Sequence, residues 1–123
     1  MVGSWPAPAP DVAVTQQRRR LGQRGEQLAA DKLAGLGYEI VQRNYRCTEG
    51  EIDIVTRLAG RWVFVEVRTR RGDQFGSPEE SVTPRKRAHL IASARHYLQD
   101  HDALNADWRI DAVAVVLSNV ICE

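Results

Sequence analysis

Two neighbouring runs of the chain carry carboxylates at positions where a divalent cation could bind. The first run reads Gly50-Glu51-Ile52-Asp53-Ile54-Val55, and the second reads Trp62-Val63-Phe64-Val65-Glu66-Val67-Arg68. Both are rich in β-branched and aromatic residues, and a short segment ending in Gly60 separates them, which predicts a β-hairpin. Carboxylate oxygens are the ligands that hard cations such as Mg²⁺ take. Asp53 and Glu66 are therefore the first candidates for chemistry.

The predicted register of this hairpin brings the two carboxylates together. We expect residues 59 and 60 to form a two-residue turn that pairs Leu58 with Arg61. The same register places Asp53 directly opposite Glu66. Opposed side chains have Cβ atoms about 4.5–5.5 Å apart, and like charges there destabilise a sheet. A divalent cation bound between the two carboxylates would remove that repulsion.

An ordinary solvated sheet face is the alternative interpretation. The same register places Glu51 opposite Arg68, so these two residues could form a simple ion pair. Side chains alternate between the faces of a strand, which predicts that Ile52 and Ile54 share the face away from Asp53. Most charged residues on strands are solvated, so the residues alone leave both interpretations open.

Composition indicates one domain of ordinary size without a strong overall charge. The chain has 123 residues, 43% of them hydrophobic, and a net charge of +1. This charge gives no global basic field, but local basic clusters can still contact phosphates. Three clusters stand out: Arg18, Arg19 and Arg20 with Arg24; Arg68, Arg70 and Arg71; and Arg85, Lys86 and Arg87. For any one cluster, solvated surface is the commoner explanation.

The elements that must position these residues follow from periodicity and breakers. A Pro- and Ala-rich tail over residues 1–14 is expected to be disordered, and residues 15–123 are expected to form a single domain. A helix is predicted over residues 15–36, with Leu28, Ala29, Leu33 and Leu36 on its apolar stripe and a stop at Gly37. Glu26 lies at the edge of that stripe, where it could reach over the sheet. Close packing would explain the costly glycine beside it, Gly25.

The second half of the chain is predicted to complete a mixed sheet. A strand over residues 38–45 precedes the hairpin, and a polar loop over residues 69–81 follows it. Thr83-Pro84 then begins a helix that ends near Gln99. Lys86 lies on its apolar stripe, where snorkelling to solvent is preferred over contact with an anion.

The last predicted strand covers residues 108–117, and a short fifth strand is expected at residues 120–122. The apolar run of the longer strand indicates burial on both faces, with Arg109 as the partner of Asp111. Helices alternating with strands in this order predict an α/β domain whose mixed central sheet of four to five strands is flanked by helices.

Cysteines and histidines suggest no site. Cys47 and Cys122 stand in no Cys-x-x-Cys or Cys/His zinc pattern, which is typical of reduced thiols in a cytoplasmic protein. The three histidines, His89, His96 and His101, have no metal-ligand spacing among themselves. The chain has no run of 18 apolar residues and no signal-peptide pattern at its N-terminus, so we expect no association with a membrane.

Several motifs in this order resemble a known family. They are Gly25-Glu26, Arg43-Asn44-Tyr45-Arg46, Gly50 to Val55, Phe64 to Arg68, and the helix that carries Lys86. Together they resemble the YraN-like family, uncharacterised protein family 0102 of bacteria, over about residues 18–116. That family is similar to the restriction-endonuclease-like nucleases and to archaeal Holliday junction resolvases. The resemblance therefore implies a restriction-endonuclease-like core, with DNA or another nucleic acid as partner.

The resemblance also implies roles for individual residues. It makes Glu26 the helix carboxylate, Asp53 the central ligand of Mg²⁺ or Mn²⁺, and Glu66 the Glu of a Glu-x-Lys motif. Arg68 stands where that motif has Lys, and this is a departure. Arginine supplies charge to a phosphate but keeps its proton, so it cannot act as a base. Phosphate contacts are expected from Arg68, Arg70, Arg71, Arg85 and Lys86.

Three functions follow from these observations. The first is a metal-dependent endonuclease acting on DNA, for which branched substrates and a two-fold dimer would suit the resemblance. The second is a nucleic-acid-binding protein of the same fold whose catalysis is weak or lost because of Arg68. The third is an interaction module in which the opposed carboxylates pair with arginines. Metal binding separates the first from the third, and cleavage of DNA separates the first from the second.

Overall fold

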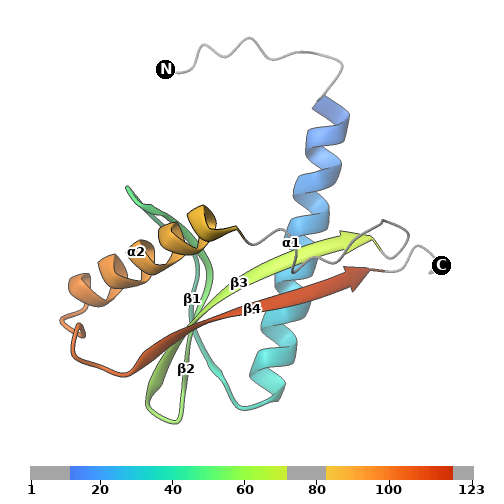
Figure 1. The fold of residues 1–123 in the computed structure, drawn as a ribbon. Coiled ribbons are helices and arrows are strands. Elements are labelled where there is room, and N and C mark those ends of the chain that lie inside the picture. The colour runs from blue at the N-terminus through green and yellow to red at the C-terminus, as the bar shows by residue number, and fades with distance from the viewer. Residues whose placement is uncertain (1–11, 72–82, 118–123) are drawn as a thin grey trace.

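Two helices and four strands make up the fold in a computed structural model, which describes residues 12–71 and 83–117. In chain order these are α1 (Val12–Gly35), β1 (Glu39–Cys47), β2 (Gly50–Leu58), β3 (Arg61–Arg71), α2 (Pro84–Asp100) and β4 (Trp108–Leu117). The strands form one sheet in the order β1-β2-β3-β4 (Figure 1). β1, β2 and β3 are antiparallel, whereas β3 and β4 are parallel. The predicted α/β class with a mixed sheet is confirmed; the fifth strand expected at residues 120–122 lies outside the described residues.

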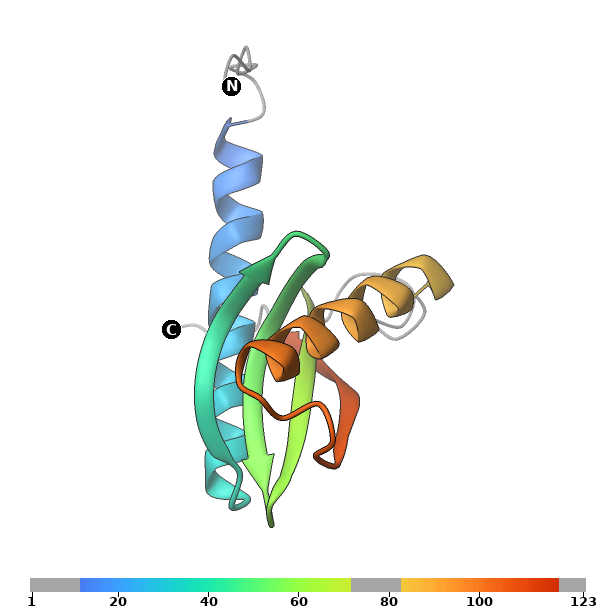
Figure 2. The same ribbon diagram turned by 90° about the vertical axis from the view of Figure 1, so that its left-hand side faces the viewer.

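The two helices cover opposite faces of the sheet, so there are two apolar layers. Figure 2 shows α1 behind the sheet and α2 in front of it. The layer under α1 consists of Ala29, Ala30, Leu33, Ile54, Val63, Val65 and Val67. The layer under α2 consists of Tyr45, Ile52, Val55, Trp62, Phe64, Ala94, Tyr97 and Leu98. In the described part of the chain, neither helix has an apolar stretch long enough to cross a membrane.

Helix α1 begins at Val12, three residues before the predicted start, and ends at Gly35. Of the predicted stripe, Ala29 and Leu33 are buried as expected, whereas Leu28 and Leu36 are exposed and Ala30 is buried in addition. Small side chains let the helix lie close to β3. At Gly25 the approach is closest, since a Cβ there would overlap the side chain of Thr69. The expectation of close packing at Gly25 is therefore confirmed.

The β2–β3 hairpin has the predicted turn and the predicted register over its outer half. Ala59 and Gly60 have φ values of 52° and 81°, as a two-residue turn between twisted strands requires. Leu58 pairs with Arg61, and the pairing continues in the same register to Ile54 and Val65. It stops there, one pair before Asp53 would lie opposite Glu66. At that point a hydrogen bond from the Val67 backbone N–H to the Asp53 carboxylate takes the place of a backbone–backbone hydrogen bond between the strands.

The predicted alternation of β2 is wrong beyond this point. Ile54 packs under α1, whereas Ile52 packs under α2, so the two residues lie on opposite faces of the sheet. The regular alternation of side chains is therefore interrupted between Ile52 and Ile54. Glu51 consequently faces β1, where it pairs with Arg46 at 3.2 Å from Nε to Oε1. The expected pairing of Glu51 with Arg68 is therefore also wrong.

Helix α2 has the predicted bounds and cap. Thr83 is the N-cap, its hydroxyl accepts a hydrogen bond from the Lys86 backbone N–H at 3.1 Å, and Pro84 occupies the first helical position. Leu90, Ala94, Tyr97 and Leu98 are buried against the sheet, together with Ser93. The predicted apolar stripe is confirmed except at Ile91, which is only partly buried.

The last two strands differ in part from expectation. β3 continues to Arg71, so residues 69–71 belong to a strand and not to the predicted loop, whose remainder over residues 72–82 lies outside the described residues. β4 has the predicted bounds, but it is an edge strand of the described sheet, and Ala112, Ala114 and Val116 are exposed on one face. The apolar run of β4 was predicted to be buried on both faces, but only one face of the strand is covered. The expected contact between Arg109 and Asp111 is confirmed at 3.1 Å from Nε to Oδ2.

Candidate functional site

Asp53 and Glu66 are both buried, at 7% and 5% exposed, where β2 and β3 cease to pair. Because the ladder stops there, the backbone N–H of Val67 donates a hydrogen bond to Asp53 Oδ2 at 2.7 Å. This bond turns the carboxylate toward β3 and its neighbour Glu66. We call Asp53 and Glu66, together with Glu26, Arg68 and Lys86, the carboxylate site.

Glu66 has two cationic partners. Its Oε2 lies 3.0 Å from Lys86 Nζ and 3.3 Å from an Nη of Arg68. Arg68 projects from the same face of β3, as alternation predicts. Lys86 comes from the first turn of α2, and its amine contacts an anion, so the prediction that it snorkels to solvent is wrong. Sequence reasoning undervalued this contact because Lys86 and Glu66 are neighbours only through the packing of α2 on the sheet.

Glu26 reaches the same region from the other helix. Its side chain is 18% exposed, and Oε1 lies 3.7 Å from an Nη of Arg43 on β1. Arg43 also donates a hydrogen bond to Gln27 Oε1 at 2.8 Å. Arg43 therefore holds the middle of α1 against the sheet, a role that its place in the motif did not reveal.

The pKa values show that the carboxylates share one electrostatic field. Burial, and after it the charge of Glu66, raises the pKa of Asp53 to about 7, although the Val67 N–H opposes the shift and Glu26 adds to it. Burial also raises the pKa of Glu26, against the lowering effect of Arg43. Negative charge in this region is thus only partly compensated by the protein's own cations.

The carboxylate site fits a hard cation only after its side chains move. Among the described residues, the ligand atoms of Glu26, Asp53 and Glu66 do not all lie within 4.8 Å of one another. Asp53 and Glu66 offer oxygen atoms, which suit Mg²⁺ or Mn²⁺. A cation that binds both would compete with Lys86 and Arg68 for Glu66.

The remaining predicted phosphate contacts lie around this site. Arg68 and Arg70 are half-buried on β3, and Arg85 is exposed in the first turn of α2, next to Lys86. The side chain of Arg71 lies outside the described part of the structure. Basic groups from β3 and from the start of α2 therefore lie on the α2 side of the buried carboxylates, where a phosphate could approach.

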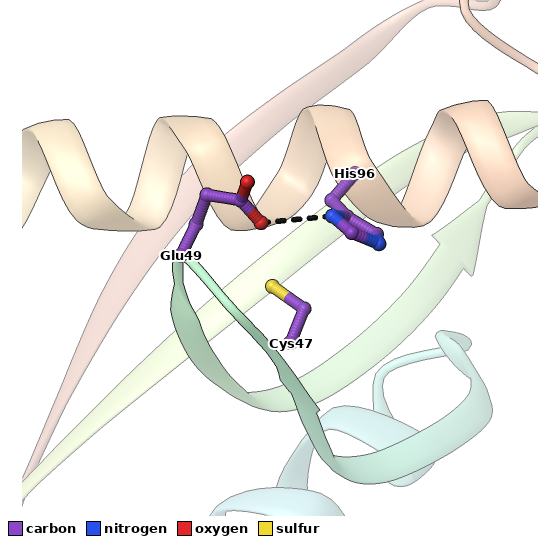
Figure 3. Close-up of side chains that lie close together, drawn as sticks. All are labelled: Cys47, Glu49 and His96. Carbon is purple, nitrogen blue, oxygen red and sulfur yellow. Dashed lines mark hydrogen bonds and ion pairs between the residues drawn. The ribbon is translucent and has the colours of Figure 1, made fainter.

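A second cluster, which sequence reasoning missed, lies further along α2. Cys47 ends β1, Glu49 lies in the turn before β2, and His96 projects from α2 (Figure 3). Their ligand atoms lie within 4.8 Å of one another, and His96 Nδ1 is 2.8 Å from Glu49 Oε1. Hydrogen bonds from Cys47 and His96 lower the pKa of Glu49. We call these three residues the turn site.

Nothing in local spacing connects the members of the turn site, because Glu49 and His96 are 47 residues apart. The available signal was a Cys-x-Glu pair in a tight turn, together with a histidine off the apolar stripe of a helix. Gly50 makes the contact feasible. It has a φ of 148°, and a Cβ there would lie 3.1 Å from Ser93 Oγ of α2. A glycine at this position therefore lets the turn lie against the helix.

Comparison with known proteins shows consistent similarity to one family. The profile of the family "Uncharacterised protein family UPF0102" matches residues 25–115. A UPF0102 protein of Dehalococcoides mccartyi is 54% identical over 101 residues, which cover 82% of this chain and 84% of that protein. A relative from Roseiflexus castenholzii is 53% identical over 103 residues, which cover 83% of this chain and 83% of that protein. A relative from Moorella thermoacetica is 50% identical over 104 residues, which cover 85% of this chain and 87% of that protein. The matched region includes every residue of the carboxylate site and of the turn site.

Proposed function

The chain belongs to the uncharacterised protein family UPF0102, and from that premise we propose that it is a divalent-metal-dependent nuclease that hydrolyses phosphodiester bonds in DNA. The observation that carries the proposal is the pair of buried carboxylates, Asp53 and Glu66, on neighbouring strands with two cationic groups beside them. Buried acids with a raised pKa gather at functional sites more often than elsewhere.

Asp53 is the residue best suited to hold the ion. Its pKa of about 7 means that near neutral pH it can exchange a proton for a cation. Mg²⁺ or Mn²⁺, when bound, would polarise the scissile phosphate and lower the pKa of an attacking water. Glu66 would be the second ligand, and Glu26 would complete the acidic field from α1. This set provides oxygen ligands only, as hard cations prefer.

Lys86 supplies the chemistry that Arg68 cannot. An amine that loses its proton can accept one, whereas a guanidinium stays charged at any ordinary pH. Lys86 Nζ lies 3.0 Å from Glu66 Oε2, so an amine stands beside this carboxylate although position 68 is an arginine. We assign Lys86 to proton transfer and phosphate contact, and Arg68 to phosphate contact. Arg70, Arg71 and Arg85 would extend that contact along the nucleic acid, which a two-fold dimer could bind at a branch.

A nucleic-acid-binding protein without catalysis is the second candidate. It is favoured by the same ion pairs, because Lys86 and Arg68 already balance Glu66 without any metal. In that case the basic groups would hold phosphates, and Asp53 would serve only the hairpin through its bond to Val67.

The test is cleavage of branched and linear DNA with Mn²⁺ by the wild type, Asp53→Asn, Glu66→Gln and the matched control Glu39→Gln. Glu39 is an exposed strand carboxylate at the start of β1. We expect Asp53→Asn and Glu66→Gln to lose about 100-fold or more in rate, and Glu39→Gln to retain it. Cleavage by Asp53→Asn at the wild-type rate would refute the proposal. Binding of DNA in EDTA without any cleavage in Mn²⁺ would favour the second candidate.

A further inference from the structure

The geometry points to a separate transition-metal site, in which Cys47, Glu49 and His96 bind Zn²⁺ and a water molecule takes the fourth position. The proposal concerns a different set of side chains from the carboxylate site and does not depend on nuclease activity. Its ligands come from the end of β1, the β1–β2 turn and the middle of α2 (Figure 3).

The ligand types select the metal. A thiolate, an imidazole and a carboxylate are the usual zinc ligands, and three protein ligands with one open position are common in zinc sites. Mg²⁺ and Ca²⁺ prefer oxygen alone, so this set disfavours them. The carboxylate site has the opposite preference, since its ligands Asp53 and Glu66 offer only oxygen.

The distances require only a small movement. Two nitrogen or oxygen ligands of a tetrahedral zinc ion lie about 3.4 Å apart. Glu49 Oε1 and His96 Nδ1 are 2.8 Å apart and joined by a hydrogen bond, so they must separate by about half an ångström. Any proton on Nδ1 must leave it for solvent, and the neutral imidazole then carries its proton on Nε2, beside Asp100. Glu49 lies on a turn and its side chain is 40% exposed, which allows this shift. On binding, the Cys47 thiol gives its proton to solvent and coordinates as a thiolate.

Neighbouring groups already orient the ligands. His96 Nε2 lies 3.5 Å from Asp100 Oδ2, one helical turn further along α2. A carboxylate at the second ring nitrogen is the usual arrangement behind a metal-bound histidine, because it fixes the tautomer and ring orientation. The imidazole of His89 also contacts the backbone carbonyl of Glu49 at 2.9 Å between Nδ1 and O. The turn is therefore held against the helix before any ion binds.

The site is open enough for an ion to enter. The side chain of His96 is 36% exposed, Cys47 is partly exposed, and Glu49 and His96 line a hollow on the surface of α2. Bound zinc would join the β1–β2 turn to α2, the helix whose first turn carries Lys86. The ion would thereby fix the helix that contributes to the carboxylate site.

The experiment is titration of the metal-free, reduced full chain with Zn²⁺ by calorimetry, and with Co²⁺ by absorption spectroscopy. We expect one ion per chain and a thiolate-to-cobalt charge-transfer band. Cys47→Ser should abolish the band, and Glu49→Gln and His96→Gln should weaken Zn²⁺ binding at least 10-fold. His96 is exposed enough that His96→Gln should fold, which keeps the test informative if Cys47→Ser is unstable.

Matched controls keep the interpretation clear. Cys122→Ser removes the chain's other cysteine, and His101→Gln removes another histidine of the same region, which bonds to the Tyr97 carbonyl. Both should bind Zn²⁺ like the wild type. Asp53→Asn should also retain the cobalt band, so a failed nuclease proposal would not affect this one. A band that survives Cys47→Ser, or equal Zn²⁺ affinity in the wild type and His96→Gln, would overturn the inference.

Discussion

The carboxylate site and the turn site lie along the same helix, yet they differ in burial, ligand chemistry and charge balance. The carboxylate site is buried between the helices, offers oxygen alone and already contains two cations of the chain. The turn site is partly exposed, offers sulfur, nitrogen and oxygen, and has another acid, Asp100, behind its histidine. The comparison teaches that burial determines how much stability is lost when one charge of a cluster is removed, whereas ligand type determines which ion the cluster can bind.

Glu66→Gln should have the largest effect on stability, because it leaves Lys86 and Arg68 without their shared anion. We expect the free energy of unfolding to fall by about 2–3 kcal/mol in urea denaturation. The value is below that of a wholly buried pair because the Lys86 side chain is 40% exposed. Glu49→Gln in the turn site, measured without metal, should change stability far less, because an exposed ion pair contributes little. Equal losses in the two variants would remove the distinction between the sites.

Lys86→Ala should have the next largest effect, on cleavage. If Lys86 transfers a proton, its loss should lower the rate about 100-fold or more, which is about 2.7 kcal/mol of barrier. Arg87→Ala, in the same turn of α2 and exposed, is the matched control and should retain the rate. Arg68→Lys should change little. A gain of about 10-fold in Arg68→Lys, with no loss in Lys86→Ala, would assign the proton transfer to position 68 instead.

The pH dependence of stability should come from the buried carboxylate site. Asp53 has a folded pKa of about 7, above its unfolded value near 3.9, so the folded state binds more protons between these values. Stability should therefore fall as pH rises from 5 to 8, by about 2 kcal/mol, and stay level above that range. The like charges of Glu66, Glu26 and Glu51 contribute to the shift.

Asp53→Asn is the variant that tests this dependence, since an amide does not titrate. It should largely lose the fall in stability between pH 5 and 8, when thermal unfolding is followed at both values. Saturating Mn²⁺ at pH 8 should raise the melting temperature of the wild type by mass action and leave Asp53→Asn unchanged. An equal Mn²⁺ shift in both proteins would place the ion elsewhere.

Local signals predicted the elements well, because they depend on residues close in sequence. Thr83-Pro84 marked the start of α2, and the two-residue turn at residues 59 and 60 fixed the outer register of the hairpin. The inner register failed because the carboxylate of Asp53 accepts the N–H of Val67, so a side chain replaces a ladder bond. Side-chain alternation holds only while the backbone hydrogen bonding between the strands is continuous, and the residue pattern of β2 does not show where that bonding ends.

Contacts between distant elements explain the other differences. Lys86 was expected in solvent because the sequence of its own helix does not indicate the contact with Glu66. The turn site was not predicted because its members come from β1, a turn and α2. The hairpin pattern supplied Asp53 and Glu66 as candidates, and the family resemblance gave them roles, but their surroundings depend on how the helices pack. The exposed face of β4 was also not predicted, because the position of a strand in the sheet depends on distant elements. An Ala/Val run does not distinguish an edge strand from a central one.

Replacing Arg85 by Ala should have the smallest effect, a few-fold weaker DNA binding with a flatter salt dependence. Arg85 is exposed at the start of α2, beside Lys86, so it would neutralise about one phosphate, and the slope of log K against log salt should fall by about 1. Arg95→Ala is the matched control, because Arg95 is exposed on the same helix but lines the hollow beside the turn site. If DNA lies over the carboxylate site, Arg85→Ala should flatten the slope and Arg95→Ala should not. The reverse result would place the nucleic acid over the turn site, and zinc bound there would then be close to the phosphates.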